Sequence, residues 1–380
     1  MDFRDYLGIG FFSGLILMST LHGVLLALIL LCNKNLNSKS NKYLAMALLG
    51  ICVILAYEFV YWLDLEDKIP VWIQYLPLYI RTTIPVGIFY FVLFLVQPEH
   101  RLTKFEKLGL WAIALELLLE MVYIPVNLFL KDPDHIAIAE DYIIILGWFL
   151  SVFAAMVFLP LALRKVNQYQ KFLYDNYSTT ARKSLRWLQV FLTLVLLGMI
   201  LGVISFLQYV FGYYDASEST FAIVVISFVI LLFAIGYFLI LQYNWFEIAP
   251  LKNNKGGAVS ISSKLSDNTN AYYNQLIALL QDEKVYEDVN LTLDKLSERL
   301  QISSGYLSQI IKEKEQKNFF EFINFHRIAS VKEKLVDTDY KNYTIMGVAL
   351  ECGFNSKSTF NAVFKKFTNE TPSAFKRRHA

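Results

Sequence analysis

The sequence predicts an all-α protein, in which a bundle of seven transmembrane helices precedes a smaller all-α region with two helix-turn-helix units. Three observations lead to this fold class. First, 56% of the 380 residues are hydrophobic and only 18% are charged, with a mean hydropathy of +0.42, which is too apolar for an ordinary soluble protein. Second, long apolar stretches lie before Phe246. Third, the apolar residues near the C-terminus recur at i, i+3, i+4 and i+7, the spacing of short amphipathic helices.

Each apolar stretch is long enough to cross a hydrocarbon core of ~30 Å, which needs about 20 helical residues. The seven predicted spans are residues 7–31, 43–63, 71–96, 108–130, 142–163, 185–211 and 221–243. They define a membrane domain over residues 1–246.

The distribution of lysine and arginine predicts the orientation of this domain. Twelve of these residues lie in the first, third and fifth loops, whereas Arg4, Lys68 and Lys131 are the three in the N-terminal segment and the even loops. We therefore expect the N-terminus outside the cell and the odd loops in the cytoplasm. Seven spans then place the C-terminus in the cytoplasm.

A polar linker is predicted between the membrane domain and the C-terminal domain. Residues 247–270 contain proline, glycine, asparagine and several serines, which favour turns over a continued membrane helix. The C-terminal domain then covers residues 271–380, and residues 271–281 can form its first helix.

The last of the amphipathic patterns predicts two short helices joined by a tight turn over residues 344–368. Ile345, Val348, Ala349 and Cys352 form one apolar stripe, and Phe360, Val363, Phe364 and Phe367 form the next. Gly353 between them permits a positive φ, so that the helices can cross steeply, and Phe354 can fill the angle. A plain helical hairpin with a solvated basic face is the alternative to a DNA-reading motif.

The outer face of the second helix is polar at its start and basic at its end. This order suits a helix whose N-terminal end reads base edges while its other end meets phosphates. The candidate DNA-binding residues there are Asn355, Ser356, Lys357, Thr359, Asn361, Lys365 and Lys366.

These residues resemble a known family. The order Ile345, Ala349, Gly353-Phe354, Ser358, Phe360, Phe364-Lys365-Lys366 and Thr371-Pro372 is similar to the second helix-turn-helix of AraC/XylS-type transcription regulators. A first helix-turn-helix at residues 291–314 and a connecting helix at 318–337 complete the likeness.

The resemblance implies binding to double-stranded promoter DNA, and a bacterial inner cell membrane as the bilayer. In the first unit it implies the readers Ser303, Ser304, Tyr306, Leu307 and Gln309. Two positions depart from the family pattern. Gln316 and Asn369 stand near positions where the family often has glycine, and asparagine tolerates the left-handed region better than glutamine does.

Ionisable residues inside predicted spans are costly, so they are candidate functional sites. We expect Arg81 to pair with Glu58 or with one of the glutamates Glu116 and Glu120, which share a helix face. A polar cavity formed in this way could bind a small ligand. An internal ion pair that only fixes helix packing is the alternative.

The sequence shows neither a catalytic constellation nor a cofactor motif, and Cys32, Cys52 and Cys352 lack metal-ligand spacing. We therefore predict a membrane-bound one-component regulator, not an enzyme, that responds to an unknown small-molecule or membrane signal. A homodimer is plausible for such a tethered reader. The alternative function is a transporter or membrane receptor with an appended regulatory or interaction domain.

Overall fold

The computed structural model describes residues 3–32, 38–63, 65, 68, 80–129, 133–180, 183–245 and 268–379. Side chains are described in these ranges except at 3–9, 123–129, 133–144, 214–218 and 238–245. The chain divides into two compact units. The first is Met1–Asn167 with Leu185–Pro250, and the second is Gln168–Ser184 with Leu251–Ala380. A short segment from the middle of the chain therefore belongs to the C-terminal unit.

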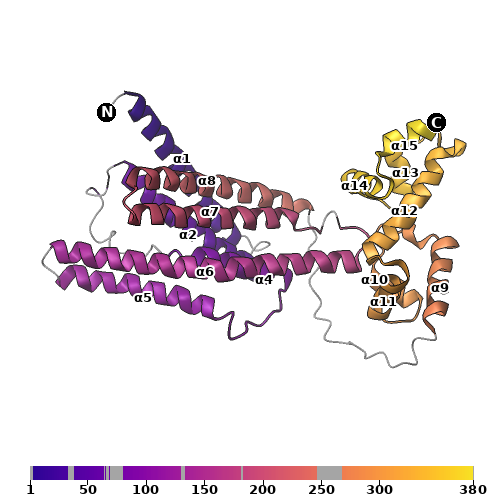
Figure 1. Ribbon diagram of the computed structural model, residues 1–380, viewed down its shortest axis with the longest axis horizontal. Helices are drawn as coiled ribbons and strands as arrows, with labels where there is room; N and C mark the ends of the chain where they lie inside the picture. The colour runs from indigo at the N-terminus through magenta and orange to yellow at the C-terminus, as the bar shows by residue number, and fades with distance from the viewer. Residues whose placement is uncertain are drawn as a thin grey trace. The chain divides into compact units, whose positions relative to one another are not determined.

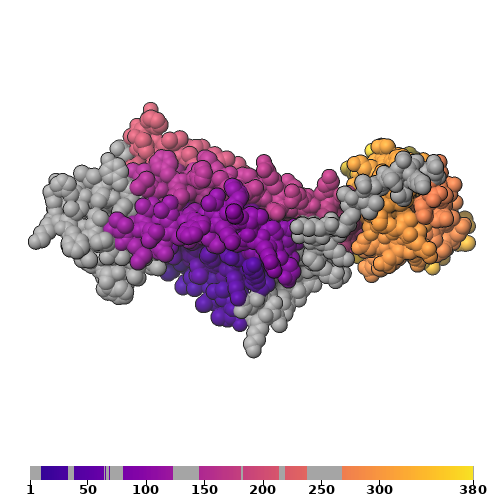
Figure 2. Space-filling model, turned by 90° about the horizontal axis from the view of Figure 1, so that it is seen from below, coloured from indigo at the N-terminus to yellow at the C-terminus, as the bar shows by residue number. Residues whose placement is uncertain are grey.

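The first unit is a bundle of helices. Its elements are α1 (Phe3–Cys32), α2 (Lys39–Trp62), α4 (Thr83–Val96), α5 (Leu108–Phe129), α6 (Pro133–Asn176), α7 (Arg186–Val210) and α8 (Tyr214–Trp245). The end of α6 from Gln168 onward belongs to the second unit. Helix α1 packs against α2 and α8, α2 packs against α4, and α7 packs against α8 (Figure 1). In Figure 2 the purple atoms from the α4 region lie beside the indigo atoms of the first helices. Together with the second unit, the described residues form helices and turns without a strand, which confirms the all-α prediction.

Five helical stretches in the described residues are long and apolar enough to cross a membrane. They are Gly10–Cys32, Lys39–Trp62, Ile145–Asn176, Arg186–Val210 and Ser219–Tyr237. Residues 71–79 of the third predicted span lie outside the described residues, and its remaining part contains α4, an apolar helix of 14 residues. Helix α5 occupies the place of the fourth predicted span.

The outward faces of these helices are apolar. On α7, Val190, Leu194, Leu197, Ile200 and Ile204 are exposed although all are aliphatic. An exposed apolar face of this extent suits contact with lipid chains, where no hydrophobic penalty arises. The apolar helices therefore suggest membrane association.

Helix α6 extends further than the sequence analysis predicted. The predicted span ends at residue 163, but the helix continues to Asn176 through residues that had been assigned to a loop. The reason is a second apolar stripe, because Val166, Tyr169 and Leu173 follow one another at helical spacing and are fully buried. Lysines and arginines around this stripe hid the helical pattern.

The second unit carries the C-terminal helices. They are α9 (Thr269–Gln281), η3 (Val285–Glu287), α10 (Leu293–Arg299), α11 (Ser304–Glu315), α12 (Phe319–Val336), η4 (Thr338–Tyr340), α13 (Ile345–Glu351), α14 (Lys357–Thr368) and α15 (Pro372–His379). Helices α10 to α14 each begin at a side-chain N-cap that accepts a backbone N–H, which satisfies one of the orphan donors of the first turn. The capping residues are Thr292, Ser303, Asn318, Thr344 and Ser356.

Two hydrophobic cores fill this unit, and α12 contributes to both. Phe319, Phe322 and Ile323 from its first half pack with α9, α10 and α11. Residues of its second half, including Ile328 and Val331, pack with α13, α14 and α15. Each helix-turn-helix unit therefore has its own core, and one helix joins the two.

Candidate nucleic-acid interface

The two helix-turn-helix units have the same plan. In each unit a first helix of seven residues, α10 or α13, precedes a second helix of twelve, α11 or α14. The second helices begin at the N-caps Ser303 and Ser356 and end at Gln316 and Asn369, whose φ angles of 55° and 60° are left-handed. The described geometry thus repeats although the two sequences have little in common.

The turn of the second unit requires glycine at position 353. Its φ is +89°, and a Cβ there would lie 2.6 Å from the carbonyl oxygen of Tyr286 and 2.9 Å from that of Glu287. Any larger residue would meet backbone atoms as well as an unfavourable φ. Phe354 next to it is buried against Phe360, as the sequence predicted.

The outer face of α14 is open to solvent. Lys357, Asn361 and Lys365 are exposed at successive turns of this helix, and Asn355 is exposed just before it. Ser356 and Thr359 are half-buried, and the Ser356 hydroxyl accepts the Thr359 N–H as the helix cap. A polar helix N-terminus followed by lysines presents donors to base edges and positive charge to phosphates.

The first unit corrects part of the prediction. Leu307 was expected to contact DNA, but its side chain is fully buried in the first core, so that expectation is wrong. Tyr306 is also buried, with its hydroxyl 3.1 Å from that of Thr269. The Ser304 hydroxyl donates to Asp294 Oδ1 at 2.5 Å, which holds it against α10. Of the predicted readers in this unit, Ser303 and Gln309 are exposed.

Two residues of α11 that the sequence analysis missed share the face of Gln309. Ser308 is half-buried and Lys312 is exposed, and both lie within one turn of Gln309 on the helix. Aligning the buried positions of α11 with those of α14 would have found them, because Ser308 then corresponds to Asn361 and Lys312 to Lys365. The buried positions of the two second helices therefore align their exposed faces residue by residue.

Lys366 is engaged within the protein. Its Nζ lies 2.6 Å from Glu321 Oε1, and Glu321 belongs to the capping box at the start of α12. The hydrogen bond from Lys366 lowers the pKa of Glu321 below its ordinary value. Lys366 was predicted to contact DNA, and in this structure its charge instead faces a carboxylate.

Helix α15 adds basic residues beside the second unit. Its last turn holds Lys376, Arg377 and Arg378. Arg378 pairs with Glu370 at 2.6 Å, and Lys376 donates to the carbonyl of Tyr343 at 3.3 Å. Internal contacts therefore occupy two of these three cations.

The predicted intramembrane charges are only partly brought together. Glu116 on α5 is fully buried and accepts the backbone N–H groups of Arg81 and Thr82 at 3.1 and 2.8 Å, and the Thr82 hydroxyl at 2.6 Å. Arg81 Nη1 lies 3.9 Å from the same carboxylate. Glu120 is half-buried one turn further along α5. Glu58 on α2 is buried as well.

The carboxylate of Glu116 thus caps the start of α4 from a neighbouring helix. Gly147 of α6 covers the pair, since a Cβ there would lie 3.1 Å from Arg81 Nη1. Three hydrogen-bond donors and the close contact with α6 leave the Glu116 carboxylate little capacity to bind an added ligand. These contacts favour the packing alternative for Arg81 and Glu116.

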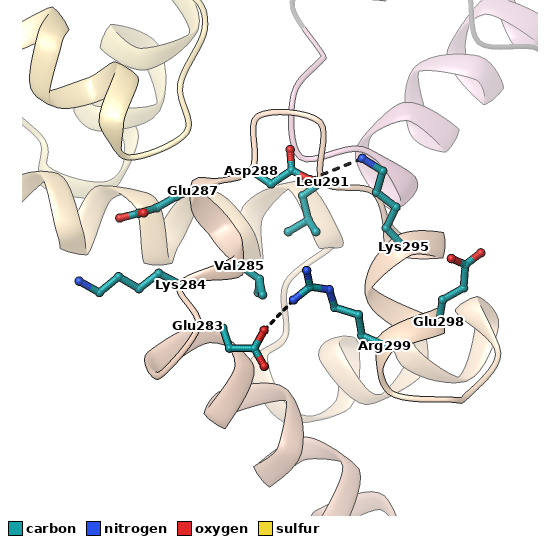
Figure 3. Close-up of a pocket in the computed structure, with 9 residues that line it drawn as sticks. All are labelled: Glu283, Lys284, Val285, Glu287, Asp288, Leu291, Lys295, Glu298 and Arg299. Atoms are coloured by element: carbon teal, nitrogen blue, oxygen red, sulfur yellow. Dashed lines mark hydrogen bonds and ion pairs between the residues drawn. The ribbon is translucent and has the colours of Figure 1, made fainter.

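A separate polar pocket of about 740 Å³ lies between η3 and α10 (Figure 3). Its walls carry charges of both signs, which pair across it: Arg299 with Glu283 at 2.8 Å and Lys295 with Asp288 at 3.5 Å. The residues that line it include none of the predicted DNA readers. The pocket is therefore distinct from the exposed faces of α11 and α14.

Comparison with known proteins supports the interpretation of the C-terminal unit. Residues 296–378 match the family described as "Helix-turn-helix domain". An uncharacterised HTH-type transcriptional regulator from Staphylococcus aureus strain COL is 33% identical over 115 residues, which cover 27% of this chain and 15% of that protein. Another from Escherichia coli strain K12 is 24% identical over 155 residues, covering 38% of this chain and 53% of that protein.

A solved structure is also similar to this region. It is the C-terminal domain of a two-component response regulator from Fusobacterium nucleatum, 31% identical, with a TM-score of 0.24, and it covers 29% of this chain and 98% of its own. By the family match and the sequence relatives, the C-terminal part of this protein is an AraC-type helix-turn-helix domain, and these relatives are HTH-type transcriptional regulators. The chain spans 15% of the Staphylococcus relative and about half of the Escherichia one.

Proposed function

We propose that this protein is a membrane-bound one-component transcription regulator. Its helical bundle responds to a small-molecule or membrane signal, and its two helix-turn-helix units bind promoter DNA directly. The observation that carries the proposal is the pair of matched second helices with exposed polar and basic faces. The described residues also include five helical stretches that are apolar enough to span a bilayer. In a water-soluble regulator, the exposed apolar faces of such helices would be in contact with water at a cost in free energy.

The proposed reading surface consists of one helix face in each unit. In the first unit it comprises Ser303, Ser308, Gln309 and Lys312, and in the second Asn355, Lys357, Asn361 and Lys365. Two recognition helices bind one face of DNA together when they meet major-groove segments about 34 Å apart, one helical turn of the duplex. We therefore expect an operator with two segments in that register.

The proposed topology places this surface on the cytoplasmic side. Twelve lysines and arginines in the odd loops against three on the other side support an external N-terminus and a cytoplasmic C-terminal domain. DNA and the readers then share one compartment.

A footprint with the full-length protein tests this function. The protein, reconstituted in lipid nanodiscs, is incubated with genomic DNA fragments at 50 and 200 mM salt. We expect two protected segments on one DNA face, and a weaker or less selective footprint for Lys357→Ala with unchanged membrane insertion. Uniform, fully salt-sensitive binding without protected segments would instead support the alternative of a transporter or receptor with an appended interaction domain.

A further inference from the structure

Two buried polar residues separate the apolar residues of α12 that belong to the first core from those that belong to the second. Asn324 and Arg327 lie between Ile323, which belongs to the first core, and Ile328, which belongs to the second. Both side chains are fully buried. A buried arginine is costly unless its donors are satisfied, so its bonds identify what it holds in place.

Every N–H of the Arg327 guanidinium has an acceptor. Nε donates to the Tyr286 carbonyl at 2.7 Å, and Nη2 donates to the Asp288 carbonyl at 2.8 Å and to Ser178 Oγ at 3.1 Å. Nη1 donates to the Ser178 carbonyl at 3.2 Å and to Thr179 Oγ1 at 3.3 Å. Burial lowers the pKa of Arg327 to about 10, which leaves it charged at neutral pH.

Ser178 and Thr179 come from the segment between α6 and α7, which belongs to the second unit. The Ser178 hydroxyl donates to the Leu291 carbonyl at 2.7 Å, and the Thr179 hydroxyl donates to that of Val289 at 3.1 Å. The amide of Asn324 donates to the Ser178 carbonyl at 3.1 Å. The segment therefore binds both the backbone that precedes α10 and the middle of α12.

The second helix-turn-helix unit meets the same arginine from another side. The turn at Gly353 packs on it, since a Cβ there would lie 2.9 Å from Arg327 Nε. The ring of Phe354 lies 5.8 Å from the guanidinium carbon. Lys334 makes a parallel link, with Glu287 at 3.7 Å and Glu351 at 3.5 Å.

We propose that Arg327, Asn324, Ser178 and Thr179 form a clamp that fixes the angle between the two helix-turn-helix units. In this role Arg327 is a positioning residue, and the segment that directly follows α6 supplies the other half of the clamp. A displacement of Ser178 and Thr179 changes the spacing of the two reading surfaces without altering either of them. The effect of the clamp on DNA binding rests on the proposed function, whereas its effect on the angle between the two helix-turn-helix units does not.

A fixed angle matters because the second unit then binds at a high effective concentration once the first is bound. Loosening such a linkage lowers the effective concentration of the second unit, and with it the affinity for a two-segment site. We expect a loss of affinity of about tenfold. The affinity for either segment alone is unaffected, because the readers themselves are intact.

The test compares two variants and a control in the full-length protein in nanodiscs. Ser178→Ala/Thr179→Val removes two side-chain acceptors of Arg327, and Arg327→Lys keeps the charge but cannot form five directed bonds. Thr338→Val is the matched control, because it removes a hydroxyl at an exposed position of the same unit. DNA affinities are measured on the wild-type footprint site and on each of its segments alone. In parallel, spin labels at Gln309→Cys and Ala362→Cys, on a Cys32→Ser background, report the distance between α11 and α14 without DNA.

We expect both clamp variants to bind the two-segment site about tenfold more weakly, to bind single segments within twofold of wild type, and to broaden the label distance. The control should match wild type in all three measurements. An unchanged label distance in both variants overturns the clamp, and so does an equal loss on single segments. A broadened distance in a protein whose wild type shows no sequence-specific footprint retains the clamp and rejects the proposed function.

Discussion

Lys366 Nζ on α14 lies 2.6 Å from Glu321 Oε1 on α12, so a basic residue of the second recognition helix is neutralised by the capping box of the connecting helix. Sequence position alone assigns this lysine to DNA. In the structure its Nζ faces a carboxylate, which would compete with a DNA phosphate for this lysine. An exposed ion pair of this kind contributes little to stability, so its effect should be larger on binding.

Glu321→Gln should therefore strengthen DNA binding. Glutamine at this position preserves the capping box with Asn318, because either side chain can accept the cap N–H. The freed Lys366 gains a phosphate contact, which raises the magnitude of the slope of log affinity against log salt by about one. Glu370→Gln, which releases Arg378 instead, serves as the comparison. An unchanged salt slope in Glu321→Gln would falsify a phosphate role for Lys366.

The same pair predicts a pH dependence of stability. The hydrogen bond from Lys366 lowers the folded pKa of Glu321, so its stabilising contribution is present above the unfolded pKa of about 4.3 and is lost as the pH falls through the folded value. The difference in unfolding free energy between wild type and Lys366→Ala should shrink as the pH falls from 7 to below 4. Amide hydrogen exchange of α12 in the full-length protein measures this difference in unfolding free energy. A difference that stays constant from pH 7 to below 4 contradicts the lowered pKa of Glu321.

Alanine substitutions of Asn361 and Lys365 should affect DNA binding in different ways. Asn361→Ala removes an amide that can bind a base edge, so we expect a loss of about 1–3 kcal/mol on the operator and relaxed selectivity at one position. Lys365→Ala removes a phosphate contact, which weakens all sequences alike and lowers the salt slope by about one. Binding to a panel of single-base operator variants distinguishes the two. Equal selectivity in both variants would remove Asn361 from base recognition.

Periodicity and turn chemistry predict much of this fold, because local sequence determines them. The steep turn at Gly353 and the apolar helices both follow from short-range patterns. Contacts between segments that are distant in the sequence cannot be predicted from such patterns. Leu307 was wrongly placed among the DNA-binding residues, although its helical spacing with Ile310 and Ile311, which are also buried, already indicated a core position.

Long-range bonds also account for what the sequence analysis missed at Arg327 and Glu116. Arg327 lies in the middle of α12 and its partners Ser178 and Thr179 lie far away in the chain, so no local pattern links them. Glu116 was expected to face a charge, yet it mainly accepts the backbone N–H groups and the hydroxyl at the start of α4. Residue type suggests an ion pair, whereas the backbone geometry that makes a cap is invisible in the sequence.

Glu116→Gln should destabilise the helical bundle. An amide offers one oxygen where the carboxylate offers two, so a donor at the start of α4 is left facing an NH₂ group. Loss of a buried hydrogen bond of this kind costs about 1–3 kcal/mol. Thermal unfolding of the full-length protein in detergent should show a lower midpoint for Glu116→Gln, and a smaller change for Glu120→Gln, whose side chain is only half-buried. A stable Glu116→Gln protein that no longer responds to its signal would instead support the ligand alternative.

Gln316→Gly should stabilise the first helix-turn-helix unit. Gln316 ends α11 with a φ of 55°, a region that costs a residue with a Cβ about 1 kcal/mol or more, whereas glycine adopts it without strain. Glycine also gains freedom in the unfolded chain, so the net gain is about 0.5 kcal/mol. Asn369→Gly is the control at the equivalent end of α14, where asparagine already tolerates a φ of 60° and the expected change is near zero. Hydrogen exchange of the α11 and α12 amides in the full-length protein measures the gain. Equal protection in Gln316→Gly and wild type would mean that the hydrogen bond from the Gln316 amide to the Glu313 carbonyl, at 3.3 Å, offsets the strain.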